Sequence, residues 1–265
     1  MTTSGDSEGR ISSERRGHLF HIGIDRPTKL NGFTPAMLSG LAEAYTAFEN
    51  DAEARVALVF AHGDNFTAGL DLPKVAPLMR QGVDLFPPGS IDPFDLRPPL
   101  RTKPVVAAVR EICFTLGIEL MLAADIVVAT RSTRFSQLEV KRGVIATGGA
   151  TLRFVERAGF GNAMHLLLTG DEFDSQTAVR LGFVQEVVDD GDDITRATAL
   201  AETIAAQAPL AVKAMRAASK AYVEGGVLAG LRDMASVQQA LAQSEDAAEG
   251  VAAFKEKRDP VFKGR

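Results

Sequence analysis

The sequence predicts an α/β protein, with a parallel β-sheet and crossover helices followed by a helical C-terminal region. Three apolar runs, residues 56–61, 105–109 and 126–129, are continuous and rich in β-branched side chains. Such runs are typical of strands that are buried on both faces of a parallel sheet. Helical segments alternate with them, which is the order that builds crossover units. We expect an α/β body over residues 17–194 and Ala-rich helices over residues 195–265.

The first predicted strand, residues 19–24, leads into a turn-rich loop over residues 25–31. Thr34 and Pro35 then resemble a helix N-cap followed by proline at the first helical position. The apolar residues after them recur at helical spacing and predict an amphipathic helix: Met37, Leu41, Ala44, Tyr45 and Phe48.

Residues 73–103 interrupt this alternation. Pro87-Pro88-Gly89 and Pro98-Pro99 cannot lie inside a long regular element. We expect an irregular insertion that shapes a pocket wall or a lid.

The rest of the chain returns to regular structure. A short helix after Asp174 ends at Gly182, and residues 184–188 form a strand. The acidic residues after Ser244 suit the N-terminus of a last helix. The other expected helices of the C-terminal region cover residues 195–207, 210–223 and 229–242.

Composition excludes several classes of protein. The chain has 265 residues and a formal net charge of −5, which disfavours nucleic acid or an anionic membrane as the main partner. The apolar region around residues 104–129 carries too many charges for an ordinary membrane span. The single cysteine, Cys113, excludes an intramolecular disulfide and favours a reducing, cytoplasmic location. Residues 1–16 lack the apolar centre of a signal peptide, and we expect a mobile polar tail there.

Two carboxylates stand in the apolar stretch of residues 104–149. Glu119 interrupts a segment that its neighbours predict to be a buried helix, and Glu139 follows twenty residues later. Buried carboxylates are rare unless they are paired or functional. Two that converge can hold and transfer a proton, since their surroundings separate their pKa values. The alternative is a structural ion pair with Arg110 or Arg142.

A second candidate element is the turn Phe66-Thr-Ala-Gly-Leu-Asp-Leu72, which follows a predicted strand. Gly69 would let a ligand approach the backbone closely, and successive amides in such a turn can point at an oxyanion. The motif by itself is a weak signal, and without further context it favours a structural turn over a ligand site. A metal site is not expected, because the four histidines form no ligand motif: His18, His21, His62 and His165.

In this context, residues 20–183 and the C-terminal segment resemble the enoyl-CoA hydratase/isomerase, or crotonase, superfamily. The order of the motifs makes the resemblance specific for the family and less so for the reaction. The matching segments are Arg26-Pro27 with Asn31, Phe66 to Leu72, Lys103 to Val109, Glu119-Leu120, Asp125-Ile126, Phe135 to Glu139, Leu168 to Gly170, Ala178 to Gly182, Glu186 to Val188 and Glu249 to Arg258.

The resemblance implies a fold and a set of site residues. The body would be a crotonase-like spiral of ββα units, and the C-terminal helices would drive assembly into a homotrimer, or a hexamer built as a dimer of trimers. Glu119 and Glu139 match the two catalytic glutamates of hydratases. The backbone amides of Ala68 and Leu116 match the donors of the oxyanion hole. Coenzyme A would lie along the loop of residues 26–31 and the turn of residues 68–72, and a neighbouring subunit would contribute Phe254 and Lys257. Its expected contacts are Arg26, Lys29, Ala68, Leu70, Asp71, Leu72, Phe254 and Lys257.

The reaction that the resemblance implies is the addition of water to a 2-enoyl-CoA thioester, without a metal or other cofactor, as in fatty acid metabolism. One alternative is another reaction of the superfamily, such as double-bond isomerisation or acyl-CoA hydrolysis. Another is an oligomeric acyl-CoA binder without activity. The hypothesis of a binder without activity is favoured by Leu116 and Glu111, which occupy positions where relatives commonly have glycine. An RNA-binding role, known within the superfamily, is disfavoured by the acidic net charge.

Overall fold

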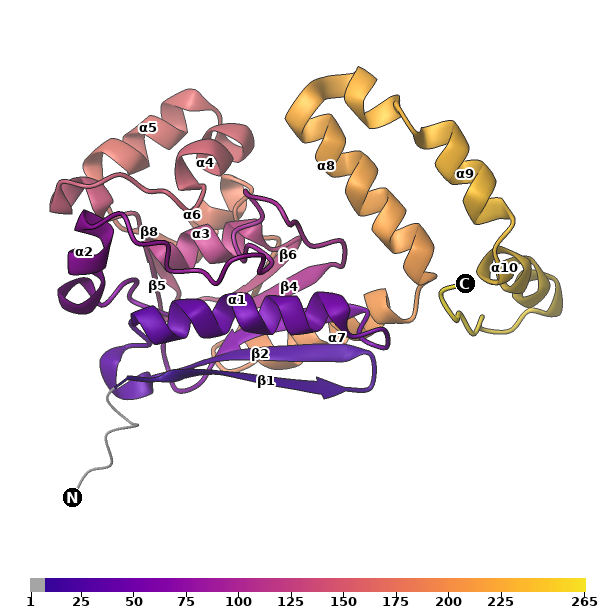
Figure 1. Ribbon diagram of the computed structural model, residues 1–265, viewed down its shortest axis with the longest axis horizontal. Helices are drawn as coiled ribbons and strands as arrows, with labels where there is room; N and C mark the ends of the chain where they lie inside the picture. The colour runs from indigo at the N-terminus through magenta and orange to yellow at the C-terminus, as the bar shows by residue number, and fades with distance from the viewer. Residues whose placement is uncertain (1–7) are drawn as a thin grey trace.

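The computed structural model describes residues 8–265 and confirms the α/β fold class (Figure 1). Its main sheet has six strands in the order β1-β2-β3-β4-β6-β9. The strands from β2 to β9 are parallel, and β1 is antiparallel to β2. The strands of this sheet are β1 (Arg10–Arg16), β2 (Leu19–Asp25), β3 (Val56–Ala61), β4 (Val105–Val109), β6 (Ile126–Thr130) and β9 (Glu186–Val188). A second sheet joins β5 (Ile112–Phe114), β7 (Arg134–Ser136) and β8 (Phe173–Asp174).

The N-terminal segment differs from the expected tail. Residues 10–16 form β1, which pairs along its whole length with β2, while residues 1–7 lie outside the described residues. β1 is an edge strand whose side chains are mostly exposed, so it carries no apolar pattern. Its place depends on backbone hydrogen bonds to β2, which a search for buried periodicity does not detect.

Two helices cover opposite faces of the main sheet. α1 (Pro35–Asn50) begins as predicted, with the Thr34 hydroxyl accepting from the Met37 amide and proline at the first helical position. It packs in the larger core with Phe20, Ile22 and Val59. α7 (Asp193–Ala205) packs on the other face, where small alanines let it approach the strands.

The predicted division at residue 195 therefore falls inside a helix of the body. Ala197, Ala201 and Ala205 recur every four residues along α7 and are buried against β3, β4 and β6. The separate helical region begins only with α8. Its elements are α8 (Pro209–Leu231, kinked at Gly226), α9 (Met234–Ala242) and α10 (Glu245–Glu256).

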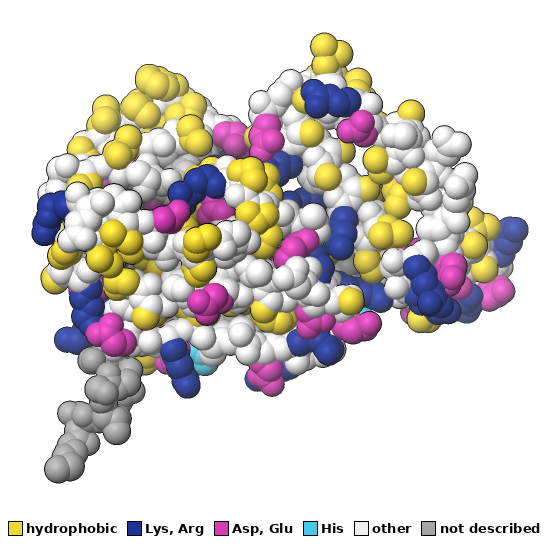
Figure 2. All heavy atoms as spheres, in the orientation of Figure 1, with side chains coloured by type: hydrophobic (Ala, Val, Ile, Leu, Met, Phe, Trp, Pro, Cys, Tyr) yellow, Lys and Arg dark blue, Asp and Glu magenta, His cyan; other side chains and the backbone are white. Residues whose placement is uncertain are grey.

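The helical region forms an arm that extends away from the body (Figure 1). Its helices expose large apolar side chains, and apolar patches are visible along the arm in Figure 2. Among the described residues, no helix is long and apolar enough to cross a membrane.

The predicted insertion is irregular only in part. Its first residues form α2 (Leu72–Arg80), a short helix that contains Pro77. Residues 81–104 have no helix or strand and run across the body beside α4 and α8, where hydrogen bonds hold them. The remaining elements are η1 (Pro27–Lys29), α3 (Leu116–Ala123), η2 (Glu139–Arg142), α4 (Ala150–Ala158), α5 (Phe160–Thr169) and α6 (Ser175–Arg180).

Candidate active site

Glu119 lies in α3, a helix in which all eight residues are buried. Its side chain is 5% exposed, and Oε1 accepts a hydrogen bond from the Ala150 amide at 3.2 Å. An added Cβ at Gly148 would lie 2.7 Å from Oε2, so only glycine fits against this carboxyl group. Burial is the main cause that raises the pKa of Glu119, to about 7, and the negative charge of Glu139 adds to the rise. The carboxyl group is therefore able to gain or lose a proton near neutral pH.

Glu139 is the first residue of η2. Its Oε2 atom is buried and has no hydrogen-bond partner among the described residues. Burial raises the pKa of Glu139, and the backbone amide of Glu139 itself, followed by the side-chain amide of Gln137, opposes the rise. The charge of Glu139 contributes to the raised pKa of Glu119, so the two carboxyl groups lie within electrostatic reach of each other.

Gln137 is a site residue that the sequence did not reveal. It is 2% exposed, yet neither polar atom of its amide has a hydrogen-bond partner in the described part of the chain. An unpaired buried amide costs free energy. The Glu139 carboxyl group is the polar group near it, because the side-chain amide of Gln137 lowers the pKa of Glu139. The position of Gln137 two residues before Glu139 is the only signal that could have identified it.

The alternative of a structural ion pair is wrong for Arg110. Its guanidinium pairs with the buried Asp193, at 2.9 Å. Neither Glu119 nor Glu139 has an ion pair with any residue between 8 and 265. Neither carboxyl group is thus held in an ion pair within this part of the chain.

The turn that follows β3 presents a different amide from the one expected. The Ala68 amide donates to the Leu30 carbonyl at 2.9 Å, and the Gly69 amide donates to the Thr67 hydroxyl at 3.0 Å. Within the described residues, the Leu70 amide has no acceptor. The assignment of an oxyanion donor to Ala68 is therefore wrong in this structure, because that N–H is already bound. Leu70 carries the free N–H of the turn.

The other expected donor is retained. Leu116 is the first residue of α3, and its amide has no acceptor among the described residues, as is usual in a first helical turn. The two turns adjoin, since Phe114 donates to the Thr67 carbonyl at 3.0 Å and a side chain at Gly69 would overlap Thr115. The free amides of Leu70 and Leu116 consequently lie on neighbouring turns, and the positive end of α3 faces the same region.

The backbone has a glycine-like conformation beside these amides. Thr115 has φ 51° and ψ −116°, and Glu111 has φ 46°. Non-glycine residues rarely adopt such values, which cost free energy. The strained conformation therefore lies at Thr115, while Leu116 itself is helical.

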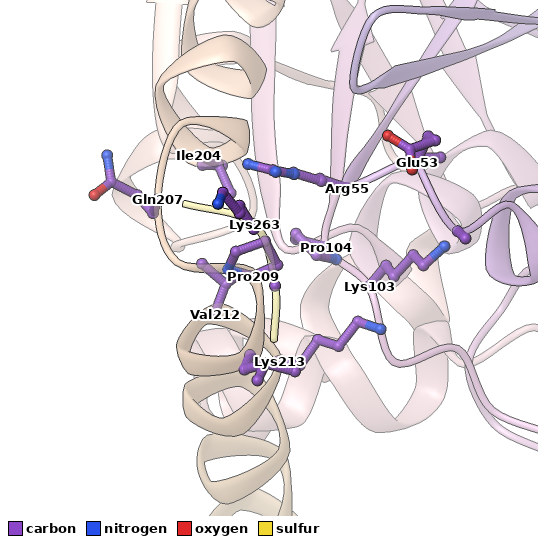
Figure 3. Close-up of a pocket in the computed structure, with 14 residues that line it drawn as sticks. Glu53, Arg55, Lys103, Pro104, Ile204, Gln207, Pro209, Val212, Lys213 and Lys263 are labelled. Atoms are coloured by element: carbon purple, nitrogen blue, oxygen red, sulfur yellow. The ribbon is translucent and has the colours of Figure 1, made fainter. Parts of the chain in front are cut away.

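The three cavities with known linings lie away from the two glutamates. One of about 120 Å³ lies where α7, α8 and the C-terminal residues meet the end of α1 (Figure 3). Its cations Arg55 and Lys103 hold main-chain carbonyl groups, so they stabilise the junction. The acceptors are Ala205 and Phe262 for Arg55, and Phe48 and Asp51 for Lys103. A second cavity, of about 810 Å³, lies against α7. A third, of about 480 Å³, lies beside Arg110. Residues 8–265 contain no group of three His, Cys, Asp or Glu side chains that could hold a metal ion.

The family model for enoyl-CoA hydratase/isomerase matches residues 14–265. The chain belongs to this family. It is 43% identical to a probable enoyl-CoA hydratase/isomerase from Mycobacterium abscessus, whose structure superposes with a TM-score of 0.92 over 96% of this chain and 98% of that one. It is 35% identical to an enoyl-CoA hydratase from Mycobacterium tuberculosis H37Rv, with a TM-score of 0.85 over 97% and 99% of the two chains. A carnitinyl-CoA dehydratase from Salmonella agona is 35% identical over 259 residues, which are 95% of this chain and 97% of that protein.

In this enoyl-CoA hydratase/isomerase family member, the expected coenzyme A residues fall into two groups. Arg26 is buried, and its guanidinium binds Asp71 at 2.9 Å and the Gly32 carbonyl at 2.8 Å. It therefore ties the loop around η1 to the turn before α2. Lys29 is exposed on η1, and Leu70, Asp71 and Leu72 are half-buried in that turn.

The second group lies on the arm. Phe254, in α10, is 86% exposed, and Lys257 directly follows that helix. Figure 1 places α10 at the end of the molecule opposite α2. The structure thus does not bring these two residues to the site of their own chain.

Proposed function

We propose that this protein is a hydratase-like lyase that adds water to a 2-enoyl-CoA thioester, or removes it in the reverse direction. The observation that carries the proposal is the pair Glu119 and Glu139. Glu119 is buried and Glu139 is half-buried, the pKa of each is raised by burial, and neither carboxyl group forms an ion pair within residues 8–265.

The reaction needs two proton transfers. One carboxylate accepts a proton from water while the water oxygen forms a bond to Cβ of the enoyl group. The π electrons move toward the thioester, and Cα takes a proton from the second carboxyl group or from the same one. Two carboxyl groups with raised pKa values, that of Glu119 being about 7, can perform both transfers.

The negative charge that develops on the thioester oxygen needs donors. The free amides of Leu70 and Leu116 are the pair we assign to it, since no described acceptor binds them. A fixed donor of this type contributes roughly 3–4 kcal/mol to the transition state. The first turn of α3 adds a favourable dipole.

Relatives support the same chemistry. The Salmonella relative is a dehydratase for a CoA thioester, and dehydration is the reverse of the proposed step. We propose that residues 81–104 shape the pocket for the acyl group of this protein's own substrate, as the sequence led us to expect.

The test is a panel of 2-enoyl-CoA thioesters of increasing chain length, followed by loss of the conjugated thioester absorbance. We expect turnover that Glu119→Gln and Glu139→Gln both abolish. Shift of a 3-enoyl double bond into conjugation would indicate an isomerase, and release of free coenzyme A thiol a hydrolase. Tight binding without any conversion would indicate the non-catalytic binder and refute the proposal.

We further propose that the protein assembles as a trimer or a dimer of trimers, with Phe254 and Lys257 completing a neighbour's coenzyme A site. The exposed apolar side chains of the arm support this assembly, because large exposed patches mark interaction surfaces.

A further inference from the structure

Arg153, on α4, joins two segments that are far apart in the sequence. Its guanidinium donates to the Phe94 carbonyl at 2.6 Å and to the Gly148 carbonyl at 3.4 Å. It also lies against Gly149, where an added Cβ would come within 2.5 Å of it. One side chain therefore connects the irregular segment 81–104 to the turn that precedes α4.

That turn is the one that contacts the carboxyl group of Glu119. The Gly148 backbone leaves no room for a side chain beside Oε2, and the Ala150 amide donates to Oε1. A change in the position of residues 148–150 would move both contacts together. The atoms that Arg153 holds thus decide how the carboxyl group of Glu119 is oriented.

The other end of this connection is also fixed. Asp92 accepts hydrogen bonds from the amides of Phe94, Leu96 and Arg97. These bonds order the short segment that carries the Phe94 carbonyl. Asp95, in the same segment, is 7% exposed and pairs with Arg216 at 2.6 Å and Lys220 at 2.7 Å, both on α8.

We propose that Arg153 is a positioning residue for Glu119: it touches no substrate, but it sets the orientation and the charge state of this carboxyl group through the turn of residues 148–150. The inference deepens the proposed function, since it concerns how the proposed proton-transfer group is prepared. Its basis is the two hydrogen bonds of Arg153 and the contacts of that turn.

The charges near Glu119 also indicate that Arg153 acts on its carboxyl group. Glu119 is influenced by Glu139, which raises its pKa, and by Arg153, which lowers it. Loss of the positive charge should therefore raise the pKa of Glu119. The charged groups that act on Arg153 itself are Asp95, Glu156, Arg101 and Asp92.

The test compares Arg153→Gln with Arg157→Gln. Arg157 is a matched control on the same helix, half-buried and bound to the Leu122 carbonyl at 2.8 Å, and it is not among the groups that shift the pKa of Glu119. The protonation of Glu119 is followed by its carboxylic-acid infrared band, identified as the band lost in Glu119→Gln. We expect Arg153→Gln to move the midpoint of this band upward by about half a unit or more, and Arg157→Gln to leave it unchanged.

Activity provides the second measurement. Arg153→Gln should lower kcat about tenfold and move the acidic limb of the kcat/KM profile to higher pH. This is the result expected if Arg153 acts on the reaction only through the carboxyl group of Glu119. Arg153→Lys, which keeps the charge but cannot reach both carbonyl groups, should restore the limb and only part of kcat. An infrared midpoint that is unchanged in Arg153→Gln, or shifted equally in both Gln variants, would overturn the proposal. Because the infrared titration needs no turnover, it remains decisive if the proposed reaction is absent.

Discussion

At the scale of single residues, Glu119 shows how a buried carboxyl group is prepared for proton transfer. Burial alone would keep it protonated, since an ionised carboxylate loses its hydration. The amide of Ala150 and the charge of Arg153 oppose this effect, and the result is a pKa of about 7. The close approach of Gly148 adds a steric requirement, because any side chain there would displace the carboxyl group.

Glu119→Gln and Glu139→Gln should each lower kcat by about 10²- to 10⁴-fold, the usual contribution of one proton-transfer group. KM should change little, because the lost interaction is made in the transition state. Steady-state kinetics on the best enoyl-CoA substrate provide the measurement. A variant that keeps kcat and raises KM would show that its glutamate only binds substrate.

Glu119 should also make stability depend on pH. Its pKa is about 7 in the folded protein against an ordinary value of 4.5, so between these values the folded chain binds more protons than the unfolded one. The free energy of unfolding therefore falls as pH rises from about 4.5 to 7. At about pH 8, Glu119→Gln should be more stable than the wild type by up to about 3 kcal/mol, at 1.36 kcal/mol per pKa unit.

Thermal unfolding of both proteins between about pH 5 and 8 checks this expectation. Glu43→Gln, on the exposed face of α1, is the control and should follow the wild type at every pH. A constant difference in Tm between Glu119→Gln and the wild type would contradict the raised pKa.

At the scale of elements, the start of α3 combines a buried helix with a strained entry. Thr115 precedes the helix in a conformation that favours glycine, and the strain lies next to the free amide of Leu116. Such strain persists where surrounding contacts determine the backbone, here the Thr115 amide bound to the Ser136 carbonyl at 2.9 Å.

Thr115→Gly should therefore raise the free energy of unfolding by about 1 kcal/mol, since it removes an unfavourable backbone conformation. The same substitution at Thr203, which is exposed and helical in α7, should lower it by roughly 0.5 kcal/mol. Denaturant unfolding measures both variants. A loss of stability at position 115 would show that the hydroxyl or methyl group of Thr115 outweighs the strain.

At the scale of the whole molecule, the arm of α8 to α10 exposes more apolar surface than a monomer needs. Leu228, on α8, is 84% exposed, and its neighbours Val227 and Leu231 are exposed as well. The arm remains attached to the body through Arg216, which binds Asp95 and Asp125. A rigid arm with an apolar face is suited to packing against other copies of the chain.

Light scattering should give a mass near three or six times that of the 28.2 kDa chain. Leu228→Glu should shift the mass toward the monomer, because a charge cannot be buried in an apolar interface without a large cost. Val83→Glu, at an exposed apolar position outside the arm, is the control. A monomeric wild type at micromolar concentration would refute assembly through the arm.

Lys257→Ala should raise KM for CoA thioesters and leave kcat nearly unchanged, since a phosphate contact is made equally in the ground and transition states. Pantetheine thioesters, which lack the nucleotide phosphates, should be unaffected. Lys255→Ala, on the exposed surface of α10, is the matched control. Equal losses for both kinds of thioester would remove Lys257 from the site.

Local patterns in the sequence were sufficient for most elements. Continuous β-branched runs identified β3, β4 and β6 because strands buried on both faces need apolar residues at every position. Thr34-Pro35 marked the start of α1, because capping is decided within four residues. The two glutamates stood out because an acid in an apolar run requires an explanation.

The tertiary structure decided what depends on residues far apart in the chain. β1 is held by pairing with β2, α7 belongs to the body because its alanines pack on the sheet, and Ala68 is excluded as a donor by the distant Leu30 carbonyl. Arg153 gained its place beside Glu119 in the same way, since nothing near it in the sequence indicates the Phe94 carbonyl. Chemical identity and periodicity are properties of the sequence itself, whereas the partner of each polar group exists only once distant segments have packed together.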